Sequence, residues 1–131
     1  MIVVDSNIIA YAAIEGDFTQ LAEKVFQTDG DWVAPNLWQI EFRNILAGYL
    51  RRKTHSFETI IGFYKHARDN LITKTFEVEY SAVLDLVNTS TLTAYDCEFV
   101  ALAMELKTKL VTLDKKILSE FPNIAISLLD F

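Results

Sequence analysis

The stretch Met1-Ile-Val-Val-Asp5-Ser-Asn7 opens the chain with an apolar run that ends in polar side chains. A short, continuous apolar run of this kind is typical of a parallel strand covered on both faces. Leu110-Val-Thr-Leu-Asp114 repeats the pattern near the other end of the chain. In α/β proteins, sites form beyond the carboxyl ends of parallel strands. Both aspartates occupy that position, so they are candidates for one shared site.

Strand-like runs alternate with segments of helical periodicity along the whole chain. The expected strands are Ile2–Asp5, Trp32–Pro35, roughly Lys74–Val78, Lys109–Leu113 and Ile124–Leu129. The expected helices lie near Asp17–Gln27, Asn36–Arg51, Phe57–Asn70, Glu79–Val87, Asp96–Lys107 and Lys115–Glu120. This alternation, with right-handed crossovers, predicts an α/β fold that is a three-layer α/β/α sandwich. Because no linker or repeat interrupts the 131 residues, we expect a single domain over residues 1–131.

Composition narrows the class of protein. The apolar fraction of 51% argues against disorder, and no uncharged apolar run reaches the roughly 18 residues of a membrane helix. The start of the chain lacks the features of a secretory signal, and the single cysteine, Cys97, fits a reducing compartment. We therefore expect a cytoplasmic protein. The net charge of −6 disfavours a broad nucleic-acid-binding surface, so any contact with a polyanion must be local, and a basic protein partner fits at least as well.

Glu41 is the acid that is hardest to explain as structure. Its neighbours one helical turn away include Trp38 and Ile45, which belong to an apolar stripe, so we expect the carboxylate to be at least half buried. Only Asn44 is close enough in the helix to form a hydrogen bond with it. An exposed position at the edge of the stripe is the alternative, and we favour a functional role.

Three other acids have ordinary structural explanations that are about as good as a functional one. Asp5 could cap a first helix, and Asp114 could cap the short helix that follows it or pair with a nearby lysine. Asp96 is the third helical residue of a capping box, Thr93-Ala-Tyr-Asp96. The apolar residues behind Asp96 fix its helix and therefore its carboxylate.

The four acids are better explained together. Carboxylates about 5 Å apart repel each other by roughly 3 kcal/mol per pair at an effective dielectric constant near 20. One or two Mg²⁺ or Mn²⁺ ions would relieve this repulsion, because these metals prefer oxygen ligands. His55, His66 and Cys97 do not have the spacing of a zinc site. We therefore expect a metal site formed by Asp5, Glu41, Asp96 and Asp114.

These residues resemble the signature of the PIN-domain family, and most of all its small VapC-like toxins. The matching pieces span almost the whole chain and are Val3-Val-Asp5-Ser-Asn7, Glu41 with Asn44, Thr93-Ala-Tyr-Asp96 and Leu110-Val-Thr-Leu-Asp114. The resemblance implies a five-stranded parallel sheet, a Mg²⁺ or Mn²⁺ cofactor and endoribonuclease activity in a toxin–antitoxin pair. It makes the four acids the metal ligands and catalytic residues, with Asn7, Asn44 and Thr112 as supporting groups. It also implies a basic antitoxin that enters the acidic pocket, and a homodimer.

The expected reaction is metal-assisted hydrolysis of RNA phosphodiester bonds, in which Asp96 or Asp114 also takes a proton from the attacking water. Candidates for basic contacts with RNA are Arg43, Arg51, Arg52, Lys53, Lys115 and Lys116. For residues 51–53, a helix end that complements its own dipole is a slightly better explanation. Tyr11, Trp38 and Tyr95 are candidates for stacking on bases, although core packing suits Trp38 better.

Two alternative functions stay open. One is a haloacid-dehalogenase-like phosphatase with Asp5 as nucleophile, although that motif has an aspartate where this chain has Asn7. The chain is also short for that fold. The other is a non-catalytic PIN-like binding module, whose carboxylates are clamped by a basic partner.

Overall fold

Five parallel strands form one sheet in the order β3-β2-β1-β4-β5 in this computed structural model, which describes residues 1–131. The strands are β1 (Ile2–Val4), β2 (Trp32–Pro35), β3 (Ile72–Phe76), β4 (Leu110–Thr112) and β5 (Ala125–Ser127). β1 lies in the centre, where Val3 pairs with both Val33 of β2 and Leu110 of β4. The chain runs from β1 outward to β3 and then returns to β4 on the other side of β1. The strand order therefore switches between β1 and β4, the position where such sheets form their sites.

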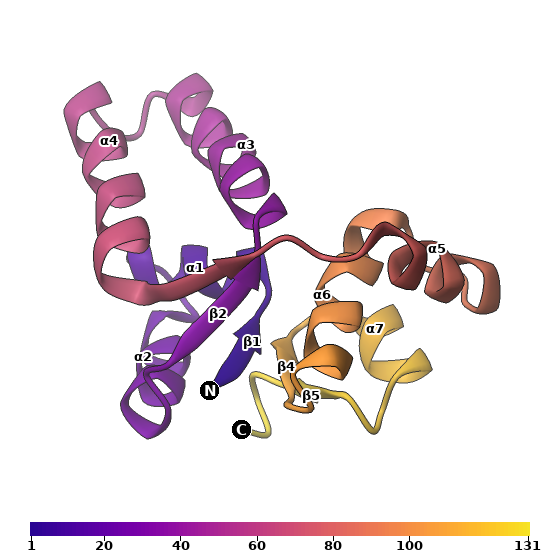
Figure 1. Cartoon of the computed structure of the whole chain (residues 1–131). Helices are drawn as coiled ribbons and strands as arrows, with labels where there is room; N and C mark the ends of the chain where they lie inside the picture. Colours follow the sequence, from indigo (N-terminus) through magenta and orange to yellow (C-terminus); the bar gives the residue numbers. More distant parts are fainter.

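Helices cover both faces of the sheet, as the three-layer prediction required (Figure 1). They are α1 (Ser6–Ala13), α2 (Thr19–Thr28), α3 (Leu37–Arg52), α4 (Phe57–His66), α5 (Tyr80–Thr89), α6 (Ala94–Glu105) and α7 (Lys115–Glu120). A π-helical turn, η1 (Ala67–Leu71), connects α4 to β3. α6 packs against β1, β2 and β4, whereas α1 packs against α2, α3 and η1. α3 and α4 pack against each other as a pair that extends beyond the sheet (Figure 1).

The core fixes the positions from which the site is formed. Every residue of β1, β2 and β4 is buried, which explains their uninterrupted apolar sequences. The middle of α6 is buried, including Phe99, Val100 and Leu102, and this packing fixes the position of its first turn over the sheet. None of the helices combines the length and the apolarity needed to cross a membrane.

The structure corrects three of the expected elements. α1 was missing from the expected helices, because its sequence has little polar face to mark it: Ile8, Ile9 and Ala10 are all buried. The helix expected over Phe57–Asn70 stops at His66, where the π-helical turn begins. β3 consequently starts at Ile72 rather than near Lys74, and the remaining boundaries differ from the expected ones by no more than about three residues.

Candidate active site

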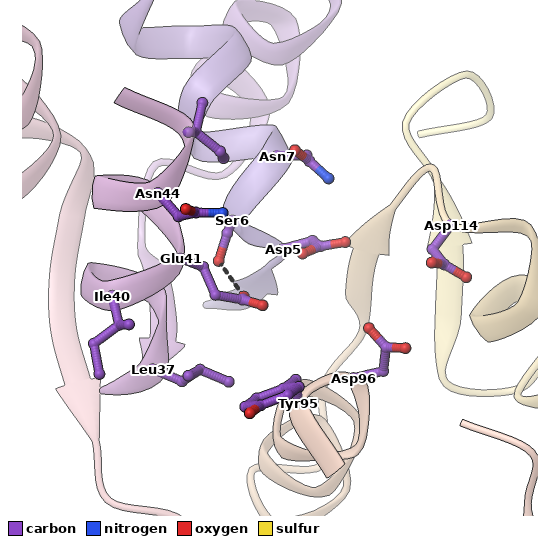
Figure 2. Close-up of a pocket in the computed structure, with 11 residues that line it drawn as sticks. Asp5, Ser6, Asn7, Leu37, Ile40, Glu41, Asn44, Tyr95, Asp96 and Asp114 are labelled. Carbon is purple, nitrogen blue, oxygen red and sulfur yellow. Dashed lines mark hydrogen bonds between the residues drawn. The ribbon is translucent and has the colours of Figure 1, made fainter. Parts of the chain in front are cut away.

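A hollow of about 500 Å³ lies at the carboxyl ends of β1 and β4, bounded by the first turns of α1 and α6 and by the first half of α3. We call it the acidic pocket, because all four acids singled out in the sequence line it (Figure 2). Its lining residues are Asp5, Ser6, Asn7, Leu37, Ile40, Glu41, Asn44, Ile45, Tyr95, Asp96 and Asp114. No Lys or Arg is among them, and none of the four acids forms a salt bridge.

Asp5 is held at the end of β1 by both its backbone and its side chain. Its backbone N–H donates to the carbonyl of Val111 at 3.1 Å, and its own carbonyl accepts from Ile8 as α1 begins. The carboxylate does not cap α1, so the capping explanation is wrong for this side chain. Instead, Oδ2 accepts a 2.8 Å hydrogen bond from the Thr112 hydroxyl on β4. The two central strands are therefore joined directly behind the pocket.

Glu41 projects into the pocket from the second turn of α3. Its Oε1 accepts a 2.8 Å hydrogen bond from the buried hydroxyl of Ser6, the first residue of α1 (Figure 2). The side chain is partly buried, as the apolar stripe predicted. Asn44 lines the pocket but does not bond to Glu41, so the sequence pointed to the wrong partner. The actual partner comes from another helix.

Asp114 caps a helix while it lines the pocket, whereas the side chain of Asp96 does not cap one. The Thr93 hydroxyl accepts from the backbone N–H of Asp96 at 3.1 Å, which is half of the expected capping box. Asp114 caps α7 by accepting from the N–H of Ile117 at 3.0 Å through Oδ1. Its second oxygen has no partner within the chain. Capping and function are therefore compatible explanations for Asp114, whereas the carboxylate of Asp96 has no capping bond.

The electrostatics of the pocket favour a bound cation. Burial raises the pKa of Asp5 above its ordinary value, and the negative charges of Asp96 and Asp114 raise it further, against the lowering effect of Thr112. Burial also raises the pKa of Glu41, with contributions from the charges of Asp5, Asp96 and Glu98. A positive charge in the pocket would reverse both shifts, because it favours the ionised carboxylate.

The four acids have the right ligand atoms for a hard divalent cation, but their side chains are too far apart to bind one as they stand. The carboxylates supply oxygen ligands, which Mg²⁺ and Mn²⁺ prefer. With the side chains as they stand, however, no three His, Cys, Asp or Glu residues converge closely enough to hold a metal ion. Hydrogen bonds hold one oxygen each of Asp5, Glu41 and Asp114, whereas the Asp96 carboxylate accepts no hydrogen bond within the chain. An ion held by all four acids would therefore require Asp96 and Asp114 to turn toward Asp5 and Glu41.

The remaining predicted residues fall into two groups. Asn7 and Asn44 line the acidic pocket, and Thr112 lies behind it, bonded to Asp5. The basic residues predicted to contact RNA do not line it: these are Arg43, Arg51, Arg52, Lys53, Lys115 and Lys116. Among the aromatic residues, Tyr95 is 64% exposed at the rim, whereas Trp38 is 1% exposed and belongs to the core.

Sequence reasoning missed one residue that lines the pocket and one nearby charge that acts on Glu41. Ser6 lies inside the quoted stretch Val3-Val-Asp5-Ser-Asn7, yet nothing in its local sequence indicates a bond to a residue 35 positions away. Glu98 is partly buried, which raises its own pKa, and its charge acts on Glu41. In the sequence, the only indication that Glu98 lies near the pocket was its position one turn after Tyr95 on α6.

Comparisons with known proteins identify the kind of domain. The family profile described as PIN domain matches residues 2–124. A crystal structure of PAE2754 from Pyrobaculum aerophilum is similar, with a TM-score of 0.78, 20% identity and coverage of 98% of this chain and 90% of that chain. No curated protein sequence matches the chain.

Two further solved structures share the fold. A toxin–antitoxin complex from Klebsiella pneumoniae gives a TM-score of 0.72 at 14% identity, and each chain is covered completely. VapC20 of Mycobacterium tuberculosis, described as a toxin that cleaves the sarcin–ricin loop, gives 0.67 at 12% identity, covering 92% of this chain and 95% of that one. At these identities the likeness establishes the fold.

Proposed function

The chain belongs to the PIN domain family, and from this premise we propose that it is a Mg²⁺- or Mn²⁺-dependent endoribonuclease, the toxin of a toxin–antitoxin pair. One observation carries the proposal. Four carboxylates from four separate elements line one pocket that contains no basic side chain. Such an arrangement is costly for folding unless a cation compensates it. Membership of this family also sets aside the phosphatase alternative.

The chain's own residues would position the reaction. Asp5, Glu41, Asp96 and Asp114 supply the metal ligands, and the bonds from Thr112 and Ser6 fix two of them. A bound divalent ion lowers the pKa of a coordinated water and neutralises charge on a phosphate. Asp114 has one carboxylate oxygen free of intramolecular bonds, so it is suited to accept a proton at the edge of the pocket. The exposed ring of Tyr95 lies where a nucleobase next to the cleaved bond could stack.

The assignments of substrate and partner rest on the proteins that share the fold. One similar structure is a toxin that cleaves the sarcin–ricin loop, and another is a toxin–antitoxin complex. A pocket lined by acids and by no basic side chain is also complementary to an Arg or Lys of an antitoxin. We also propose that the chain binds a basic antitoxin and forms a homodimer.

The primary test is cleavage of total RNA by the purified protein with Mn²⁺ and with EDTA. We expect cleavage only with the metal, and Asp5→Asn and Asp96→Asn should each reduce it at least 100-fold, an effect typical of groups that act directly in catalysis. Asp85→Asn, an exposed acid on α5 outside the pocket, is the matched control and should leave it unchanged. Full activity in EDTA, or in the Asp5→Asn variant, would refute the metal mechanism.

A second test separates a nuclease from a non-catalytic module. Expression of the chain alone should slow growth, and the Asp96→Asn variant should not. Thermal stability of the wild type should rise with millimolar Mn²⁺ by mass action. A protein that binds Mn²⁺ but neither cleaves RNA nor slows growth would be a binding module.

A further inference from the structure

A second hollow, of about 440 Å³, continues from the acidic pocket between α1 and α3. The two hollows share three lining residues, Asn7, Asn44 and Ile45, so they form one path along the surface. We call the second hollow the side groove. It is lined by Asn7, Ala10, Tyr11, Ile14, Gly16, Asp17, Phe18, Asn44, Ile45, Gly48, Tyr49 and Arg52.

The far end of the side groove carries a positioned positive charge. The Arg52 guanidinium lies over the ring of Tyr49, with Cζ 4.5 Å from the ring centroid. It also lies against Gly48, where a Cβ atom would be only 3.2 Å from Nη1. Arg52 forms no salt bridge, although Asp17 also lines the groove. The guanidinium of this exposed side chain therefore lies over Tyr49 without a carboxylate partner.

The rest of the side groove suits a single-stranded nucleic acid. Tyr11 and Phe18 pack with ring centroids 4.9 Å apart, and Tyr49 adds a third ring on the opposite wall. Grooves that bind single strands combine aromatic rings with positive charge along the backbone path. Glu41 and Arg52 are eleven residues apart on one helix, or about 16 Å at 1.5 Å per residue. That distance places Arg52 a few nucleotides from a phosphate in the acidic pocket.

On the basis of the proposed function, we propose that the side groove guides the RNA strand away from the acidic pocket and that Arg52 binds one of its phosphates. Arg52 is thus a substrate-positioning residue and does not take part in the chemistry. The dipole of α3 is an alternative reason for a basic residue at this helix end. Arg51 shares the same last turn but lines neither hollow, so it separates the two explanations.

The experiment compares Arg52→Ala, Arg52→Lys and Arg51→Ala with the wild type in two assays. The first measures steady-state cleavage, with Mn²⁺, of the RNA fragment that contains the main cleavage site in total RNA. We expect Arg52→Ala to raise KM about tenfold with kcat nearly unchanged, as for loss of one charge-assisted contact. Arg52→Lys should recover part of the loss, and Arg51→Ala should raise KM much less than Arg52→Ala does.

The second assay measures binding of a labelled single-stranded oligoribonucleotide of about 20 nucleotides at several salt concentrations. Arg52→Ala should weaken binding and reduce the slope of log affinity against log salt by about one, because one phosphate contact is lost. Equal effects of Arg51→Ala and Arg52→Ala in both assays would overturn the proposal. So would an Arg52→Ala variant that handles RNA normally but resists inhibition by a co-expressed partner, since the groove would then bind protein. If the wild type binds this RNA without cleaving any, the proposed function fails while the role of Arg52 is still decided by binding.

Discussion

Thr112 and Asp5 are 107 residues apart in the chain, yet the Thr112 hydroxyl donates a 2.8 Å hydrogen bond to Oδ2 of Asp5. The same hydroxyl accepts from the backbone N–H of Asp114 at 3.0 Å. Thr112 is completely buried, so water cannot replace these bonds. One side chain therefore sets the positions of two acids that end neighbouring strands.

We expect Thr112→Val to lower the free energy of unfolding by about 1–3 kcal/mol. The substitution keeps the shape of the side chain, but it removes the donor to Asp5 and the acceptor for Asp114. A buried polar group left without a hydrogen-bond partner destabilises the folded state by about this amount. Urea denaturation measures the change. Thr112→Ser keeps the hydroxyl and is the matched control, which should lose less. A valine variant as stable as the wild type would show that the bond to Asp5 does not contribute.

The raised pKa values of Asp5 and Glu41 predict how stability depends on pH in the absence of metal. The folded protein binds more protons on these groups than the unfolded chain does, so its stability falls as the pH rises from about the ordinary values of 3.8 and 4.5 through the raised pKa values. Asp5→Asn removes one of these groups while leaving an oxygen to accept from Thr112. In EDTA at neutral pH, we expect this variant to have the higher melting temperature.

Metal should reverse the order of the two melting temperatures, so that the wild type becomes more stable than Asp5→Asn. Mn²⁺ should raise the melting temperature of the wild type and have a smaller effect on Asp5→Asn, which lacks one ligand. Asp85→Asn should follow the wild type in both conditions. If Asp5→Asn were less stable than the wild type in EDTA, repulsion within the pocket would not be the dominant effect.

Ser6 is expected to position Glu41 and to take no part in the chemistry itself. Ser6→Ala removes the hydroxyl that holds Oε1 of Glu41, so the carboxylate gains rotational freedom at the edge of the pocket. We expect metal-dependent cleavage to fall about tenfold, roughly the effect of one hydrogen bond to a charged group. Glu41→Gln should reduce it about 100-fold, which leaves a residual rate that can still be measured. In the presence of the Glu41→Gln substitution, Ser6→Ala should have no further effect, and an additive loss would indicate an independent role for Ser6.

The sequence predicted most of the fold because each central strand is covered on both faces and reads as an uninterrupted apolar run. It failed at α1 for a related reason, since Ile8 and Ile9 are buried and the helix shows little of the polar face on which periodicity depends. The four acids could be found because each ends or interrupts an apolar segment. Their hydrogen-bond partners could not, because Ser6 and Thr112 are brought to them only by the packing of distant elements.

Gly48 and Gly62 offer a matched pair for separating helix stability from RNA binding. Both lie inside helices, α3 and α4, so replacing either by alanine should raise the free energy of unfolding by about 0.5–1 kcal/mol. A Cβ atom at Gly62 meets nothing within 4 Å, whereas one at Gly48 presses on Nη1 of Arg52 at 3.2 Å. Because that guanidinium is the end of a flexible side chain, it can move aside at little cost to folding.

We therefore expect both variants to be more stable than the wild type in urea denaturation, with Gly48→Ala gaining less. Only Gly48→Ala should weaken binding of the single-stranded oligoribonucleotide, since it shifts Arg52 without removing its charge. Normal RNA binding by this variant would mean that the placement of the guanidinium over Gly48 is unimportant. Weaker binding by Gly62→Ala as well would attribute the effect to the stability of the helical pair α3 and α4 rather than to Arg52.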